Sequence, residues 1–168
     1  MLSSTTVANI SPLLDRKIEE ISAGIPASYS LHLRSAGQNN VKVIIDYIVA
    51  MKSEVNLSDH YRRDLIEVLS KFSKYNDNRP FKDLTRSNVI AFLDIYRRTE
   101  AQDPLHKWIG TYNIYRIHLL RFFKWLYYPD LEPSKRPKPS VIENIPQLKR
   151  KEKSIYEAYR KLAQNSSL

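Results

Sequence analysis

Apolar residues recur with a helical period through the middle of the chain. They are spaced three or four positions apart over residues 40–53, 58–75, 85–100 and 110–127, which places them on one side of a helix. The chain has 3 glycines, and its 9 prolines lie outside these four segments, a distribution that argues against a sheet with many turns. We therefore predict an all-α fold in which the four segments form a four-helix bundle.

Local signals support the boundaries of these helices. Ser58 and Thr85 are residue types that cap helix N-termini, and a turn-forming run at residues 76–80 separates the second predicted helix from the third. Eight apolar residues on the helical stripes are expected in the core. They are Leu65, Leu69, Phe72, Phe92, Leu93, Leu119, Phe123 and Leu126.

The fourth predicted helix is apolar on more than one side. Outside its main stripe it carries Ile114, Ile117 and Trp125. A helix of this kind is expected in the middle of a bundle or beside a second partner.

Both ends of the chain look different from the middle. Residues 1–37 are expected to be a flexible leader, in which Ser11 and Pro12 begin one short helix. Residues 129–168 carry five prolines and then a basic cluster, which predicts an extended, semi-rigid linker followed by a short C-terminal helix. The helical domain is therefore predicted to span residues 38–128.

Composition excludes several classes of protein. The chain has no cysteine, so disulfides, thiol nucleophiles and cysteine-ligated zinc are excluded. It has no apolar run long enough for a membrane span and no signal-peptide pattern at its start. We therefore predict a soluble, cytoplasmic protein without a membrane partner.

The sequence also contains no pattern typical of an active site. Its 4 histidines are scattered without metal-ligand spacing, and it has neither a glycine-rich phosphate loop nor a Gly-x-Ser-x-Gly nucleophile motif. Acidic residues are not grouped as a Mg²⁺ site would require. We predict no catalytic residue, no metal, no cofactor and no small-molecule substrate.

Positive charge is concentrated in the last two thirds of the chain. Residues 1–56 hold 5 basic and 5 acidic residues, residues 57–127 hold 13 and 8, and residues 128–168 hold 9 and 5. This distribution is typical of a module that binds a polyanion. A generic basic protein with no such partner is the alternative.

Basic and amide side chains lie opposite the apolar stripes of the second and fourth predicted helices. Lysine and arginine supply phosphate contacts, and asparagine and arginine also read base edges in the major groove. The candidate DNA-binding residues are Arg63, Lys71 and Lys74 on the second helix, Thr111, Asn113, Arg116, Arg121 and Lys124 on the fourth, and Lys149, Arg150, Lys151 and Lys153 in the linker. Asn113 is the first candidate for a base contact. The alternative is that all of these are ordinary solvated side chains.

Three segments resemble one protein family, in the same order. Residues 58–65 (SDHYRRDL) are similar to the opening helix of the N-terminal core-binding, SAM-like domain of tyrosine recombinases and phage integrases. Residues 83–93 (DLTRSNVIAFL) are similar to a further helix of that domain, and residues 111–126 (TYNIYRIHLLRFFKWL) to its last helix with an aromatic ending. The leader and the basic linker look most like archaeal members.

The resemblance implies a function and a limit to it. In this family the helical bundle forms half of a clamp on double-stranded DNA, with its helices in the major groove, while a separate C-terminal domain cleaves the strand. Here the sequence stops about fifteen residues past the linker, and Tyr156 and Tyr159 have no surrounding arginine and histidine set. We expect DNA binding without cleavage, linked to DNA integration and recombination, and other recombinase subunits as further partners.

Two other interpretations stay open. One is a helical protein-interaction module, in which exposed aromatic residues such as Trp125 and Tyr128 bind a partner helix. The other is an integrase remnant without a present role. DNA binding through phosphates weakens steeply with salt, whereas an apolar protein interface does not depend on counterion release.

Overall fold

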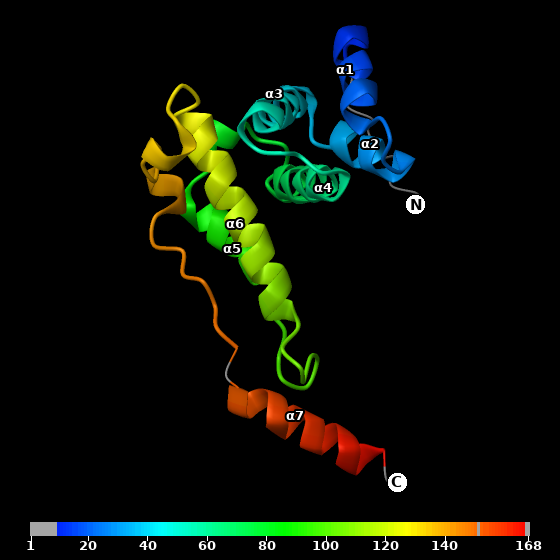
Figure 1. Cartoon of the computed structure of the whole chain (residues 1–168), viewed down its shortest axis with the longest axis vertical. Helices are drawn as coiled ribbons and strands as arrows, with labels where there is room; N and C mark the ends of the chain where they lie inside the picture. The colour runs from blue at the N-terminus through cyan, green and yellow to red at the C-terminus, as the bar shows by residue number, and fades with distance from the viewer. Residues whose placement is uncertain (1–9, 151, 167–168) are drawn as a thin grey trace.

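The computed structural model of the chain describes residues 10–150 and 152–166, and these are helical with no strand (Figure 1). Their α-helices are α1 Pro12–Ser22, α2 Ala27–Arg34, α3 Gln38–Glu54, α4 Asp59–Tyr75, α5 Arg86–Asp94, α6 Trp108–Tyr127 and α7 Glu152–Asn165. Three single turns of 3-10 helix are η1 Phe81–Asp83, η2 Pro133–Lys135 and η3 Ser140–Ile142. The all-α prediction is confirmed for these residues, but seven helices are present where a four-helix bundle was expected.

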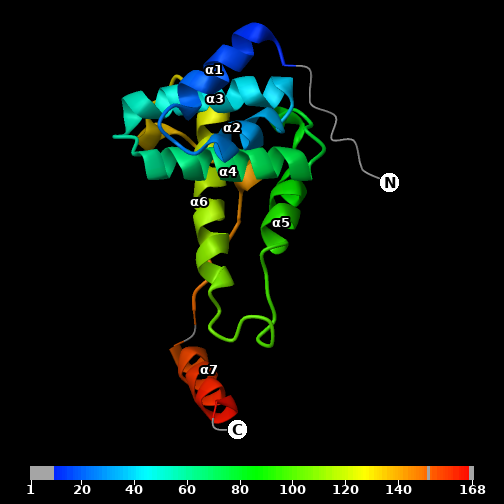
Figure 2. The same cartoon turned by 90° about the vertical axis from the view of Figure 1, so that its right-hand side faces the viewer.

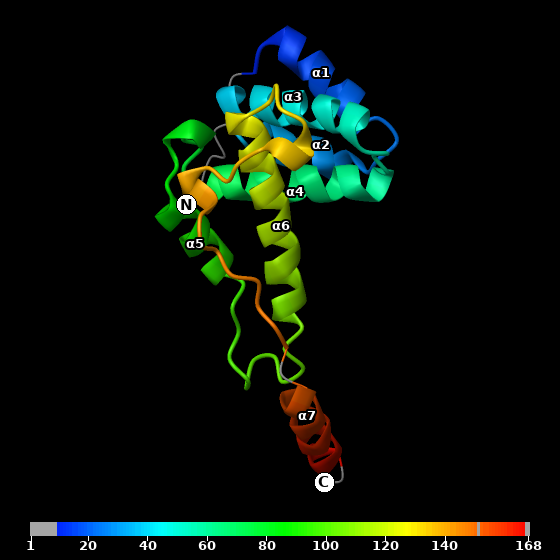
Figure 3. The same ribbon diagram turned by 60° about the vertical axis from the view of Figure 1, so that its left-hand side comes forward.

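The helices are arranged around the pair α3 and α4. These two lie side by side, and α6 crosses them steeply, so that its N-terminal half extends beyond α4 (Figure 2). On the opposite side α1 and α2 cover the pair, and α5 runs beside α6 (Figures 1 and 2). The C-terminal segment returns along α5 and α6 to α7 (Figure 3).

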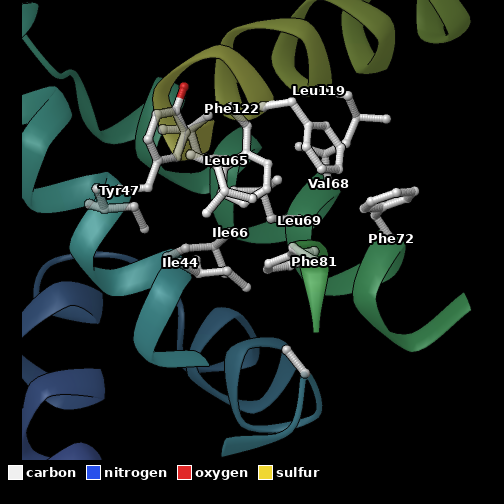
Figure 4. Close-up of a cluster of buried hydrophobic side chains, with 14 of the residues drawn as sticks. Ile44, Tyr47, Leu65, Ile66, Val68, Leu69, Phe72, Phe81, Leu119 and Phe122 are labelled. Atoms are coloured by element: carbon white, nitrogen blue, oxygen red, sulfur yellow. The ribbon is translucent and has the colours of Figure 1, made fainter. Parts of the chain in front are cut away.

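The core lies where α6 meets α3 and α4 (Figure 4). Phe122 of α6 packs edge-on against Tyr47 of α3, with 5.2 Å between ring centroids, and Phe123 packs edge-on against Phe72 of α4 at 5.9 Å. Such edge-to-face pairs add to the stabilisation from burial alone. All eight residues predicted for the core are buried.

Helix boundaries agree with the sequence where a cap defines them. The Ser58 side chain accepts a hydrogen bond from the backbone N–H of Tyr61 at 3.2 Å, and the backbone N–H of Thr85 donates to Asn88 Oδ1 at 2.9 Å. The third predicted helix is shorter than expected, because α5 ends at Asp94 instead of continuing to about residue 100. Residues 95–107 form a series of turns instead.

The expectation of a flexible leader is wrong for residues 12–34, which form two helices packed on the core. Ser11 does cap α1, accepting from the backbone N–H of Leu14 at 3.3 Å. Leu33 of α2 is fully buried, and Arg34 is hydrogen-bonded to Asp15 of α1 at 2.9 Å. Burial of these apolar side chains makes the two helices part of the folded domain.

The C-terminal linker is also not a free tether. Residues 136–148, which we call the strap, fill the space between α5 and α6, with Val141, Ile142 and Ile145 buried (Figure 3). Arg86 of α5 donates to the carbonyl oxygen of Asn144 at 2.8 Å. The prolines hold this segment extended, and its buried side chains and bonded carbonyl groups hold it in place.

Candidate nucleic-acid interface

One side of α6 is exposed and free of acidic residues. Residues 104–129 contain four cationic side chains and no acidic one. Gly110, Ile114, Ile117, Arg121 and Lys124 recur at helical spacing and form what we call the α6 face. Ile114 and Ile117 are 50% and 40% exposed. The α6 face is therefore cationic near its C-terminal end and apolar in its middle.

The residues that follow the strap add a cation to the other end of the α6 face. A Cβ atom on Gly110 would lie 3.4 Å from Nη2 of Arg150, so Arg150 lies across the start of α6. Lys149 is exposed next to it. Lys151 lies outside the described residues, and Lys153 belongs to α7, where its side chain is not described. The structure thus brings Arg150 to the same surface as Arg121.

The outer side of α4 contributes fewer free cations than the sequence indicated. Lys71 is bonded to Glu67 at 2.5 Å and to the Tyr115 hydroxyl at 3.3 Å. Partial burial disfavours its charged form, but the two hydrogen bonds outweigh this effect and raise the pKa of Lys71. Lys74 is exposed, and Arg63 Nη2 lies 3.4 Å from His60 Nδ1. Lys74 is therefore the exposed candidate on α4, whereas Arg63 is half-buried.

Asn113 and Arg116 hold the strap. Asn113 Nδ2 donates to the carbonyl oxygen of Leu148 at 2.8 Å, and its Oδ1 accepts from the Leu148 backbone N–H at 3.0 Å. Arg116 Nε donates to the carbonyl oxygen of Ile145 at 2.7 Å. Because both ends of the Asn113 amide are occupied, we do not retain this residue as a base reader. Thr111, near the start of α6, is exposed.

Arg121 is oriented by a neighbour from α4. Its Nη1 donates to the Tyr61 hydroxyl at 3.3 Å, and the Tyr61 ring packs edge-on against His118 with centroids 5.3 Å apart. Lys124 lies one turn further along α6 and is half-buried. These contacts give the guanidinium of Arg121 a defined position at the surface.

The exposed apolar residues differ from those expected. Trp125 is half-buried and lies 5.1 Å from Tyr47, measured between ring centroids, and Tyr128 is also half-buried. Ile114 and Ile117 are exposed instead. The signal for this was in the sequence, where both isoleucines lie outside the main stripe of the helix.

The described part of the chain shows two further absences. No group of three or more His, Asp or Glu side chains within it could hold a metal ion. None of its helices combines the length and the apolar character that crossing a bilayer requires.

Comparison with known proteins finds no relative of this chain. No family model matches the chain, and neither the curated proteins nor the solved structures give a match.

Proposed function

We propose that this protein binds double-stranded DNA, with the α6 face in the major groove. The observation that carries the proposal is the charge pattern of α6 and its surroundings. Residues 104–129 have four cations and no acidic residue, and Arg150 and Arg121 lie at opposite ends of the exposed isoleucines. Lysine and arginine side chains that neutralise phosphates release condensed counterions, which dominates the affinity of DNA-binding proteins.

The position of α6 would allow this helix to enter the major groove of DNA. The major groove of B-form DNA is wide enough for one α-helix, and the N-terminal half of α6 extends beyond α4 (Figure 2). Ile114 and Ile117 are exposed there, and apolar side chains of this kind contact the methyl group of thymine. Arg63 and Lys74 of α4 are the further candidates for phosphate contacts.

The resemblance to the core-binding domain of tyrosine recombinases supports this proposal. The three similar segments correspond to the start of α4, to α5 and to α6, which would be the DNA-facing helices of such a domain. Since that family places strand cleavage in a separate domain, we propose that this chain contributes binding to integration or recombination and not the cleavage itself.

A salt titration of duplex binding tests the proposal. Fluorescence anisotropy of a labelled duplex should show affinity that falls steeply with NaCl concentration. A Lys149→Ala, Arg150→Ala double variant should flatten the slope of log K against log salt by about one unit for each phosphate that is no longer neutralised.

The matched control removes the same charge from α3. Lys42 and Lys52 are both exposed there, and the Lys42→Ala, Lys52→Ala variant should bind as the wild type does. Affinity that is insensitive to salt, or equal weakening in both double variants, would reject the α6 face as the binding surface.

The exposed isoleucines favour a second candidate function, binding of a partner helix such as one from another recombinase subunit. An apolar helix face is a common docking site for a second helix. An Ile114→Lys, Ile117→Lys variant distinguishes the two functions. It should retain or strengthen nonspecific duplex binding if DNA is the ligand, because it adds two cations, but it should abolish an apolar protein contact.

A further inference from the structure

A pocket of about 350 Å³ lies beside the α6 face, at the junction of α3, α4 and α6. The segment that precedes the strap closes one side of it. Its polar lining consists of Tyr47, Glu54, Tyr61, Arg121, Lys124 and Arg136. Three cations and one acidic residue therefore surround the pocket. DNA binding by the α6 face does not account for Tyr47, Glu54 or Arg136.

The Tyr47 hydroxyl is the most unusual group in this pocket. Tyr47 is fully buried, and its hydroxyl has no hydrogen-bond partner among the described residues. Its ring is fixed between Phe122 and Trp125, at 5.2 and 5.1 Å between centroids, and the hydroxyl points away from Ile44 and Ile66 (Figure 4). Buried hydroxyl groups in proteins nearly always have a partner, from the protein or from ordered water, so this hydroxyl is free to bond a molecule that enters the pocket.

The Tyr47 hydroxyl is available as a donor. Burial raises the pKa of Tyr47 well above its ordinary value, which keeps the phenol neutral and protonated at any physiological pH. A neutral phenol both donates and accepts one hydrogen bond, whereas a phenolate only accepts. A ligand that carries acceptor oxygen atoms suits this position.

The cations of the pocket are not equally available. Arg136 is buried and paired with Glu54, and its Nε donates to the carbonyl oxygen of Tyr128 at 3.0 Å. Glu54 therefore offsets the charge of Arg136. Glu54, the acidic residue of the lining, is paired with Arg136, so Arg121 and Lys124 leave the pocket with a net positive charge.

We propose that this pocket binds a phosphate group, with Tyr47, Arg121 and Lys124 as its ligands. A guanidinium offers two parallel donors to phosphate oxygens, an ammonium offers a point charge, and the hydroxyl offers a third direction. Met51, Val55 and Pro133 form an apolar wall, against which the organic part of a phosphate ester can lie. The phosphate comes either from a free phosphate ester or from a DNA backbone on the α6 face.

The experiment uses the full chain, inorganic phosphate and the Tyr47→Phe variant. Melting temperature and tryptophan fluorescence, which reports Trp108 and Trp125 together, are measured in sodium phosphate and in sodium chloride of equal ionic strength. Wild type should be stabilised by phosphate beyond chloride. Tyr47→Phe should bind phosphate about tenfold more weakly, since it loses one hydrogen bond to a charged group.

A matched control and a second variant keep the result specific. Tyr75→Phe removes an exposed hydroxyl from α4 and should respond to phosphate as wild type does. Lys124→Met should weaken the phosphate response, as Tyr47→Phe does. In chloride Tyr47→Phe should be as stable as wild type, because removing an unpartnered hydroxyl leaves no other group unpaired. An equal phosphate response in wild type and Tyr47→Phe would overturn the proposal.

Duplex DNA then identifies the source of the phosphate. If phosphate competes with the duplex and Tyr47→Phe weakens duplex binding, the pocket takes a backbone phosphate. If Tyr47→Phe binds the duplex as wild type does but binds phosphate more weakly, the pocket takes a free phosphate ester. The DNA-binding proposal itself is read from the Lys149 and Arg150 variant, which leaves the pocket lining intact, so either proposal can fail alone.

Discussion

Single polar residues in the interior join segments that the apolar pattern does not connect. Asn40 is buried at the start of α3, where its Nδ2 donates to Ser73 Oγ at 2.7 Å and to the carbonyl oxygen of Arg79 at 2.8 Å. Its Oδ1 accepts from the backbone N–H of Phe81 at 3.3 Å. One amide therefore connects α3 to α4 and to the loop before η1, and it satisfies backbone groups that would otherwise be buried without partners.

His118 makes the stability of the protein depend on pH. It is buried in α6, and burial lowers its pKa below the ordinary value of 6.5. In the pH range between the folded-state pKa and 6.5, the unfolded chain binds more protons at this position than the folded chain does. The free energy of unfolding contributed by His118 should therefore be constant above this range and fall as the pH drops through it.

The prediction is tested by urea unfolding between pH 7.5 and pH 5. His118→Phe keeps an aromatic ring beside Tyr61 but has no titrating group, so its loss of stability with falling pH should be smaller than that of wild type. His32→Gln, which changes an exposed histidine, should follow the wild-type curve. Parallel curves for wild type and His118→Phe would show that His118 does not titrate in this range.

At the scale of elements, the strap depends on side chains of α6. Asn113→Ala removes both hydrogen bonds to the Leu148 backbone and should reduce the local stability of the end of the strap by about 1–3 kcal/mol. Hydrogen exchange at the Leu148 amide measures this directly, and its protection should fall while that of the α6 amide groups persists. Thr111→Ala, an exposed change on the same helix, should leave Leu148 protected. Unchanged protection in Asn113→Ala would mean that other contacts hold this segment.

Long amphipathic helices were predictable from the sequence because their signals are local. The stripes and caps placed α3, α4 and α6 within about two residues of their observed bounds. The sequence did not predict the short helix α2, because apolar and polar residues alternate one by one over residues 27–34, which is not a helical period. It forms because Leu33 finds a place in the core, which is a tertiary effect.

The sequence predicted which residue types the candidate site contains, but not which contacts they make. Asn113 was chosen because amides read bases, yet amides also bind peptide groups, and the chain supplies the backbone of Leu148. The sequence did not predict the packing of the strap. The strap is held partly through its backbone, whose carbonyl oxygens accept hydrogen bonds from Arg86 and Arg116, and such bonds do not depend on a side-chain pattern. The pocket around Tyr47 and Arg136 joins residues nearly ninety positions apart, and no local pattern predicts that.

At the scale of the whole molecule, α1 and α2 belong to the cooperative unit. Ile18 of α1 is fully buried, and Ile18→Ala should lower the free energy of unfolding by about 2–5 kcal/mol. Urea unfolding should give the same midpoint by circular dichroism, which reports all helices, and by fluorescence of Trp108 and Trp125, which both lie in α6.

An exposed residue of the same helix supplies the control. Leu13 is 66% exposed, so Leu13→Ala should change stability by less than about 0.5 kcal/mol. A fluorescence midpoint that is the same in Ile18→Ala and wild type, with only the dichroism curve displaced, would show that the two N-terminal helices unfold separately.

The strap is also expected to pack onto the folded domain after α5 and α6 have formed. Its contacts join distant parts of the chain, since Arg136 meets Glu54 at a separation of 82 residues and Arg86 donates to the carbonyl oxygen of Glu143 at a separation of 57. Contacts of such long range form slowly, and during synthesis α5 and α6 leave the ribosome before the strap does. The surface that Val141 and Ile142 finally cover is therefore open to chaperones, or to a second nascent chain, until the strap has emerged.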